Sequence, residues 1–208
     1  MKLGLILECQ LDGPDEKVLT CLFRRFATHI QPEFVQLGDK LEVLHGCGTA
    51  ARRLFAAGCE HIVIMWDFCP ADWGGALAQK GVAPCLLKDC RRVFRSLEAA
   101  DVSREQISLV AVNFMLESWL LADKQAIRNF LERQTRQTIK SQKIGSDKPE
   151  RCPEPKVTLN TIFKRCGYRR YLDYNDAHLI AQEIKNLDVV REQCPTFDRF
   201  WEKATGIT

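Results

Sequence analysis

The chain has 208 residues, of which 46% are hydrophobic and 27% are charged, and its formal net charge is +3. This composition excludes a disordered or fibrous protein and is sufficient for one globular domain with its own core. The longest apolar run, from Ile107 to Leu116, contains Ser108 and Asn113 and is too short to span a bilayer. We therefore expect no membrane segment.

Ten cysteines would suggest a disulfide framework in a short secreted protein. The N-terminus does not resemble a signal peptide, because Glu8 follows only a few apolar residues. No two cysteines form a Cys-x-x-Cys pair, which argues against a zinc site. We expect reduced thiols and a cytoplasmic location.

Charge is unevenly distributed along the chain. Residues 1–123 contain 13 Lys or Arg against 16 Asp or Glu, whereas residues 124–170 contain 13 against 4. The second segment could hold phosphate groups. An ordinary solvated surface of helices and loops would account for the same excess equally well.

The first half of the chain alternates between short apolar runs and amphipathic patterns. Five apolar residues, Ile62 to Trp66, predict a central strand that is covered on both faces and ends at Asp67. Further strands are predicted at 4–8, 34–37 and 107–112, and helices after the Gly13-Pro14 turn, at 50–55 with Thr49 as N-cap, and at 86–99. Such alternation predicts an α/β fold with a mostly parallel sheet flanked by helices.

From Leu116 onward the apolar residues follow a period near 3.6, which predicts helix. Residues 135–155 are polar, basic and interrupted by glycine and prolines, which predicts a loop. Helical patterns resume at 157–166, 176–187 and 194–201. We therefore predict an α/β domain in residues 1–123 and a small basic helical extension in residues 124–208, packed on that domain.

Three acids fall at or just beyond predicted strand ends: Glu8, Asp67 and Glu117. The carboxyl ends of parallel strands meet at one edge of a sheet, where ligand sites form, so we expect these acids to converge. Carboxylates gathered in this way suit Mg²⁺ or Mn²⁺. Taken singly, each is better explained as a solvated carboxylate, and only their shared position at strand ends favours a metal site. Secondary candidates are Asp12, Asp15, Glu16, Asp72 and Asp123, of which Asp72 is close enough to Asp67 for a loop to fold back.

Several motifs together resemble a known family. They are Leu5-Ile6-Leu7-Glu8, Trp66-Asp67-Phe68-Cys69-Pro70, Leu116-Glu117-Ser118-Trp119-Leu120-Leu121-Ala122-Asp123, Pro155-Lys156, Tyr168-Arg169-Arg170-Tyr171, Ala177-His178 and Cys194-Pro195-Thr196-Phe197. The chain resembles the TOPRIM-like proteins related to OLD-type nucleases, in particular a branch that accompanies an ATPase in phage-defence cassettes. The run that begins at Glu117 is the most specific part of this resemblance.

The resemblance implies a TOPRIM-like sheet and a Mg²⁺-dependent endonuclease that hydrolyses RNA or DNA, as the effector subunit of an ATPase-linked antiviral system. Glu8 would be a metal ligand or general acid/base, and Asp67 and Glu117 would be further ligands. Lys156 resembles a lysine that such nucleases set against transition-state charge. All four would be catalytic residues.

The chain departs from the TOPRIM pattern at two positions. Cys69 stands where Asp-x-Asp has its second aspartate, unless Asp72 or Glu117 replaces that ligand, and Cys9 stands where relatives have glycine. These differences leave room for a one-metal enzyme. They also leave room for a catalytically inactive partner or regulatory subunit of an ATPase complex.

A nucleic-acid-binding role is predicted for Tyr168, Arg169, Arg170 and Tyr171. Their rings could stack on bases and their guanidinium groups could bind phosphate. The same residues could equally pack the helical part of the protein.

A dinucleotide-binding protein is the alternative from another class. The run Gly46-Cys47-Gly48-Thr49-Ala50-Ala51 fits Gly-x-Gly-x-x-Ala before a helix, with Asp67 as the ribose-binding acid. Against this, the preceding segment 40–45 is a poor strand, and the fingerprint normally opens the fold.

Overall fold

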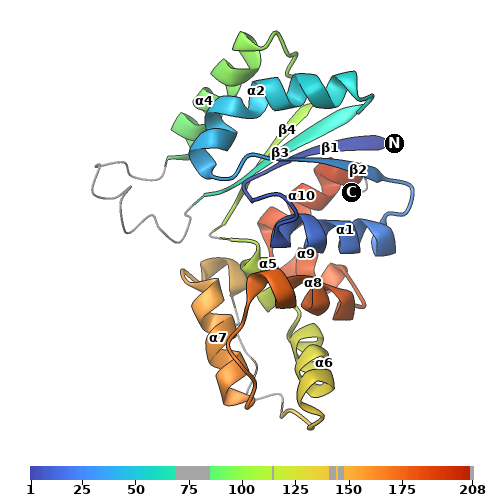
Figure 1. The fold of residues 1–208 in the computed structure, drawn as a ribbon, viewed down its shortest axis with the longest axis vertical. Helices are drawn as coiled ribbons and strands as arrows, with labels where there is room; N and C mark the ends of the chain where they lie inside the picture. The colour runs from blue at the N-terminus through green and yellow to red at the C-terminus, as the bar shows by residue number, and fades with distance from the viewer. Residues whose placement is uncertain (69–84, 114, 141–143, 145–147, 207–208) are drawn as a thin grey trace.

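The computed structural model describes residues 1–68, 85–113, 115–140, 144 and 148–206. Its centre is a four-stranded, all-parallel sheet flanked by helices, with the strand order β2-β1-β3-β4 (Figure 1). The strands are β1 (Lys2–Leu7), β2 (Gln31–Gln36), β3 (His61–Asp67) and β4 (Ile107–Val112). The predicted α/β class with a parallel, helix-covered sheet is confirmed.

The two central strands, β1 and β3, are apolar along nearly their whole length and buried on both faces. In the register, Ile6 of β1 lies opposite Val35 of β2 on one side and Ile64 of β3 on the other. The chain runs outward from β1 to β2 and, after crossing back to β3, outward in the other direction to β4. The strand order therefore reverses between β1 and β3, the place where ligand sites form in such sheets.

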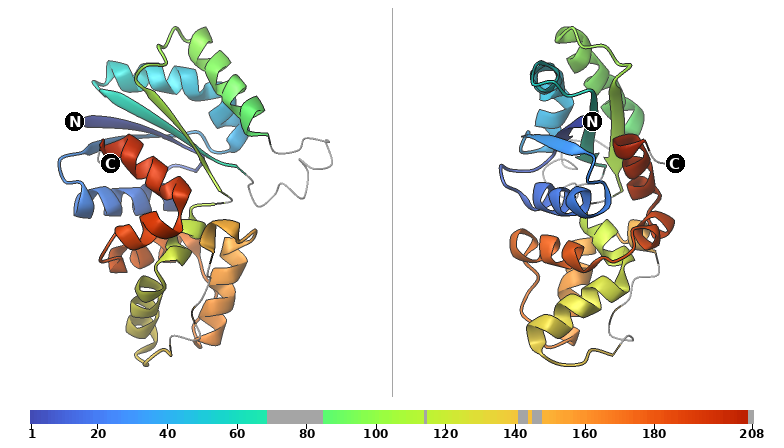
Figure 2. Two further views of the ribbon diagram at one scale, coloured as in Figure 1. Left: turned by 180° about the vertical axis from the view of Figure 1, so that it is seen from behind. Right: turned by 90° about the vertical axis from the view of Figure 1, so that its right-hand side faces the viewer.

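Helices cover both faces of the sheet. Figure 2 shows α1 (Pro14–Phe26) on one face and α2 (Lys40–Ala56) with α4 (Leu86–Ala99) on the other. On the α1 side of the sheet, α10 (Pro195–Thr205) covers β3 and β4. The aromatic residues of α10 belong to the same core as the apolar residues on that face of the sheet. The predicted boundary at residue 123 thus separates segments that share a core.

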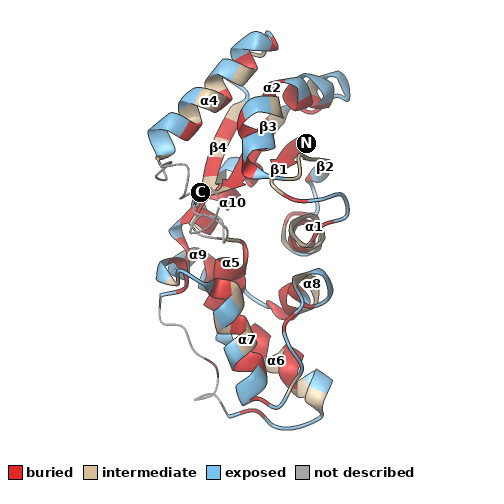
Figure 3. Cartoon of the chain, turned by 60° about the vertical axis from the view of Figure 1, so that its left-hand side comes forward, coloured by how far each residue is buried: buried red, intermediate tan, exposed pale blue. Residues whose placement is uncertain are grey.

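The second half of the chain is organised around α5 (Glu117–Ala122), all six residues of which are buried (Figure 3). The elements around it are α6 (Lys124–Thr135), η3 (Pro149–Arg151), α7 (Pro155–Arg165), α8 (Asp173–Glu183) and α9 (Asp188–Gln193). The helix predicted from Leu116 is divided at Asp123, whose side chain accepts a hydrogen bond from the amide of Ala126 at 2.9 Å and begins α6.

The dinucleotide fingerprint is not where it would have to be. Helix α2 begins at Lys40, because Asp39 accepts a hydrogen bond from the amide of Glu42 at 2.9 Å, so Thr49 is not an N-cap. The Gly46–Ala51 run lies inside this helix rather than between a strand and a helix. A Cβ at Gly48 would overlap the carbonyl of Ser96, so this glycine allows α2 and α4 to approach closely. The dinucleotide-binding interpretation of this motif is wrong.

Two further observations bear on the type of protein. Every cysteine within the described ranges is a free thiol. Among the helices that the structure describes, none is long and apolar enough to cross a membrane.

Candidate metal centre

Glu8 and Asp67 meet at the carboxyl edge of the sheet. Glu8 follows β1 directly and Asp67 is the last residue of β3. Because β1 and β3 are neighbours, the backbone amide of Asp67 can donate a hydrogen bond to Oε2 of Glu8, at 2.9 Å. These two predicted site residues are thus brought together at the point where the strand order reverses.

A third carboxylate joins them from the start of α1. Pro14 occupies the first turn of this helix, and the helix start places Asp15 beside the strand ends. Glu8, Asp15 and Asp67 together line a cavity of about 10 Å³, roughly what one water molecule or one metal ion needs. The sequence identified Asp15 only as a secondary candidate, because an acid at a helix start is common for electrostatic reasons alone.

The carboxylates at this edge disturb one another. Burial raises the pKa of Asp67 well above its usual range, and the charges of Glu8, Asp15 and Glu117 raise it further. Burial and then the charge of Glu117 raise the pKa of Asp15 to about 7, against the opposing effect of Lys156. Without a bound metal ion, the site therefore retains protons that isolated carboxylates would lose.

Glu117 and Lys156 form a second layer beside this cavity. Glu117 is 4% exposed, and its Oε1 lies 3.6 Å from Nζ of Lys156 and accepts a hydrogen bond from the Tyr171 hydroxyl at 3.4 Å. Burial raises the pKa of Glu117, while Lys156 opposes the change. The Nζ of Lys156 also donates to Asp173 at 2.8 Å.

Lys156 remains a cation in this setting. Burial acts to lower its pKa, but the carboxylates of Glu117 and Asp173 outweigh burial and raise it. In return, the hydrogen bond from Lys156 lowers the pKa of Asp173, although burial acts in the opposite direction. The structure thus places the predicted lysine next to the acids, held by an aspartate that the sequence did not single out.

The residues of this edge fit a hard divalent cation in their chemistry. Within the part of the chain that is described, no three His, Cys, Asp or Glu side chains already have the arrangement of a metal site. The donors are nevertheless carboxylates around a cavity of ion size, with more acid than base, as Mg²⁺ or Mn²⁺ requires. Glu8, Asp15 and Asp67 would hold the ion, and Glu117 would add to the negative field. Asp72 lies outside the described residues.

The other acids singled out from the sequence have local roles. Asp123 caps α6. Glu16 accepts a hydrogen bond from the side chain of Gln36 at 2.5 Å. Asp12 is exposed in a turn with a φ of 56°. None of these three lines the small cavity.

The predicted nucleic-acid contacts are mostly structural. Tyr171 is 4% exposed and packs edge-on against Phe163, so the prediction that it stacks on a base is wrong. Tyr168 is half-buried in the same aromatic cluster. Arg169 donates to both carboxylate oxygens of the buried Asp176, at 2.8 and 2.6 Å.

Arg170 is also exposed, and within the described residues its side chain makes no comparable contact. Its role in binding nucleic acid therefore stays a prediction. Tyr168, Arg169 and Tyr171 thus follow the packing alternative that the sequence left open.

Fold and site together define an α/β protein with a cluster of carboxylates at the switch point of a parallel sheet. The sequence model of the family described as "Domain of unknown function (DUF4276)" matches residues 20–203, so the chain belongs to this family. The match includes Asp67, Glu117 and Lys156, whereas Glu8 and Asp15 precede it. No curated protein and no solved structure matches the chain.

Proposed function

We propose that this protein is a TOPRIM-like, metal-dependent nuclease that hydrolyses phosphodiester bonds of RNA or DNA with Mg²⁺ or Mn²⁺. One observation carries the proposal: Glu8, Asp15 and Asp67 share an ion-sized cavity at the edge where β1 and β3 meet. A divalent ion held by such carboxylates can bind the phosphate groups of a substrate. The resemblance of the surrounding motifs to OLD-related proteins supports the same class.

Each residue has a part in this scheme. A bound Mg²⁺ would polarise the scissile phosphate and supply an activated water. Glu8, Asp15 and Asp67 would hold the ion. Lys156, kept protonated by Glu117 and Asp173, supplies positive charge where negative charge develops on the phosphate.

The test is cleavage of RNA and DNA, both single- and double-stranded, with Mg²⁺, Mn²⁺ or EDTA. We expect Asp67→Asn and Glu8→Gln each to reduce metal-dependent cleavage by about 100-fold or more, the scale on which positioned catalytic groups act. Glu105→Gln, which alters an exposed acid away from the site, is the matched control and should retain activity. Circular dichroism establishes that all three variants are folded. Activity that survives both site substitutions would rule out this assignment.

The basic segment 124–170 supplies the second part of the proposal, because its excess of Lys and Arg suits a phosphate backbone. Binding should then weaken by orders of magnitude between about 50 and 200 mM salt. Affinity that does not change with salt would contradict this role.

The second candidate is a catalytically inactive TOPRIM-like subunit that regulates an ATPase. The observation in its favour is Cys69, which stands where the second aspartate of Asp-x-Asp would be. In either case we propose an ATPase from a defence cassette as the partner. We also propose a cytoplasmic location, which the free thiols support. Absence of cleavage with every divalent metal, even with the ATPase added, would favour this candidate over the nuclease.

A further inference from the structure

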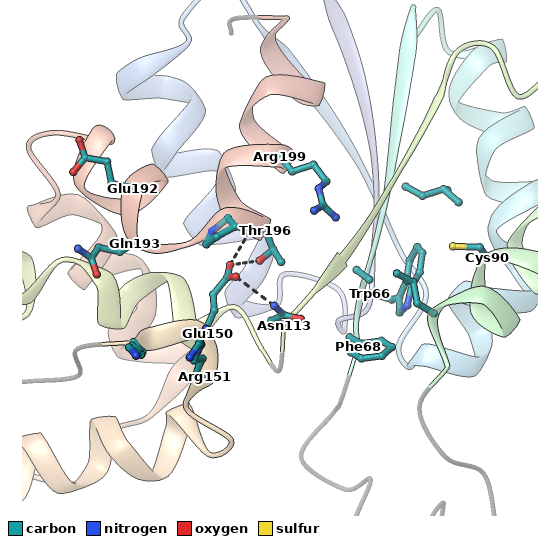
Figure 4. A pocket seen from close by; sticks show the side chains of 15 residues that line it. Trp66, Phe68, Cys90, Asn113, Glu150, Arg151, Glu192, Gln193, Thr196 and Arg199 are labelled. Carbon is teal, nitrogen blue, oxygen red and sulfur yellow. Dashed lines mark hydrogen bonds between the residues drawn. The ribbon is translucent and has the colours of Figure 1, made fainter.

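A larger pocket of about 620 Å³ lies beside β4, at the edge of the sheet, and reaches residues at the end of β3 (Figure 4). It is bordered by α4, α10 and η3, elements that are far apart in the sequence. Its volume is in the range of sites that hold a small organic molecule. Two of the sequence motifs, Trp66–Pro70 and Cys194–Phe197, contribute residues to it, but neither predicted a pocket.

One wall of the pocket is aromatic. Trp66, the penultimate residue of β3, and Phe68, which follows the strand, both line it. The carbonyl of Phe68 accepts a hydrogen bond from Nζ of Lys40 at 2.8 Å, which fixes the backbone at this point. The ring of Phe68 is half-buried, so a flat ligand could pack against it.

Trp66 has an unmet hydrogen-bonding requirement. The residue is 1% exposed, and its Nε1–H has no partner in the described part of the chain. A buried donor without a partner destabilises the protein, because it loses its hydrogen bond to water and gains none. Because Trp66 lines the pocket, an acceptor on a bound ligand is one group that would satisfy this N–H.

The opposite wall is basic. Arg199 of α10, Arg151 of η3 and Lys148 just before η3 all line the pocket and are exposed. Figure 4 shows the Arg199 guanidinium extending from α10 toward β4, with Trp66 and Phe68 on the other side of that strand. These cations are suited to a phosphate group.

Glu150 lies among these cations but is already engaged. Its carboxylate accepts hydrogen bonds from the amide of Thr196 at 2.9 Å, from the Thr196 hydroxyl, and from the Asn113 amide at 3.4 Å (Figure 4). These bonds fasten η3 to the start of α10 and partly offset the negative charge. Glu192 of α9 is a second acid in the lining, and the three cations Lys148, Arg151 and Arg199 outnumber the two acids, which leaves a net positive charge for an anionic ligand.

We propose that this pocket binds one unpaired nucleotide of the substrate strand. The base would pack against Phe68 and approach the Trp66 N–H, and the phosphate would meet Arg199 and Arg151. The inference rests on the proposed nuclease function and narrows its substrate to single-stranded nucleic acid, or to a duplex from which a nucleotide is flipped out.

The pocket and the carboxylate cavity adjoin each other. Trp66 lines both of them, and because successive side chains of a strand point to opposite faces, Trp66 and Asp67 lie on the two sides of the end of β3. A strand with one nucleotide in the pocket would pass its neighbouring phosphate over this strand end toward Glu8 and Asp67. The pocket would thereby position the bond that is cut.

Binding of three probes, in EDTA to prevent cleavage, tests the inference. The probes are a single-stranded tetranucleotide, the same sugar-phosphate chain without bases, and a fully paired hairpin. We expect the tetranucleotide to bind about 10-fold more tightly than the other two, since packing of one base is worth about 1–3 kcal/mol. Equal affinity for the chain without bases would overturn the inference.

Variants assign the binding to this pocket. Arg199→Gln should weaken binding of the tetranucleotide about 10-fold. Lys203→Gln, one turn further along α10 and outside the pocket, should leave this binding unchanged. Trp66→Phe should weaken it several-fold, and Trp201→Phe, a buried tryptophan of α10 that does not line the pocket, serves as its control. Equal losses in a variant and its control would overturn the inference. Arg199 is exposed, so its variant remains informative if Trp66→Phe fails to fold.

The two proposals fail separately. If Arg199→Gln weakens tetranucleotide binding as expected but no metal supports cleavage, the nuclease proposal fails and the nucleotide pocket stands. If cleavage depends on Asp67 but its KM is unchanged in Arg199→Gln and Trp66→Phe, the pocket inference fails and the nuclease proposal stands.

Discussion

Two acid–lysine sites lie near the end of β3, and they differ in their balance of charge. In the first site, Nζ of Lys40 lies 3.0 Å from the carboxylate of Asp89 and also donates a hydrogen bond to the carbonyl of Phe68. Both side chains of this pair are about 95% buried. In the other, Lys156 faces several carboxylates, whose charges act on one another. Those carboxylates are Glu8, Asp15, Asp67, Glu117 and Asp173.

The difference separates a structural site from a functional one. The Lys40–Asp89 pair joins α2 to α4 and fixes the end of β3, and its charges cancel. The Lys156 site retains repulsion that folding must overcome, as is common where a protein prepares a binding site. A divalent cation would remove that repulsion. The experiments below test whether the two sites behave in these opposite ways.

The largest effect on stability should come from breaking the balanced pair. Asp89→Asn leaves the buried ammonium of Lys40 without its counter-charge, so we expect a loss of about 3–5 kcal/mol in the free energy of unfolding. Urea denaturation measures it. The double variant Lys40→Met/Asp89→Leu removes both charges and should be close to neutral. A double variant as unstable as Asp89→Asn would show that the pair does more than cancel charge.

In the unbalanced site, removing an acid should change stability in the opposite direction and stabilise the protein. Asp67→Asn replaces a half-buried carboxylate whose charged form Glu8 and Asp15 repel, so the protein without metal should gain stability. We expect a rise in Tm on the order of 2–4 °C, the equivalent of about 1 kcal/mol at this chain length. Cleavage should be lost at the same time. A Tm that falls, as for Asp89→Asn, would place Asp67 among the structural carboxylates.

The pH dependence of stability should distinguish the sites without mutation. Acids with raised pKa values bind more protons in the folded than in the unfolded state, so stability falls as pH rises across that interval. With Asp15 raised to about 7 from a usual value of 3.8, the Tm without metal should fall between about pH 4 and pH 7. Mn²⁺ should raise the Tm more at pH 8 than at pH 5. An equal effect of Mn²⁺ at both pH values would contradict binding at these carboxylates.

Local sequence pattern was sufficient for the central strands and for the meeting of Glu8 and Asp67. The end of β3 at Asp67 and the helix at 86–99 were predicted where the structure has them, and β3 begins one residue before the predicted apolar run. The start of α2 was missed because the Gly46–Thr49 run looks like a break. Gly48 in fact serves contact with α4, which only tertiary structure reveals.

The rest of the site could not be derived from the sequence for a related reason. A carboxylate at a helix start, such as Asp15, has the same local pattern whether it faces solvent or a second acid from another strand. Tyr171 and Arg169 look like a binding motif until Glu117 and Asp176 are seen beside them. The pocket beside β4 draws on β3, β4, η3 and α10, so no single stretch of sequence contains its signal.

The smallest effect on stability, and the finest test of the comparison, comes from Lys156. Its side chain is 39% exposed, so Lys156→Gln should change the free energy of unfolding by less than about 1 kcal/mol. Lys156 lowers the pKa of both Asp15 and Glu117, and its removal should therefore raise both. The acid limb of the pH–rate profile should move to higher pH, and cleavage should fall by about 10- to 100-fold.

Two further substitutions sharpen this result. Lys156→Arg keeps the positive charge and should restore the position of the acid limb, whereas Lys164→Gln removes an exposed charge from the same helix and should leave the profile unchanged. A profile that moves equally in Lys156→Gln and Lys164→Gln would mean that net charge, not the local contact with Glu117, sets the titration. A profile that does not move in Lys156→Gln would separate the lysine from the carboxylates altogether.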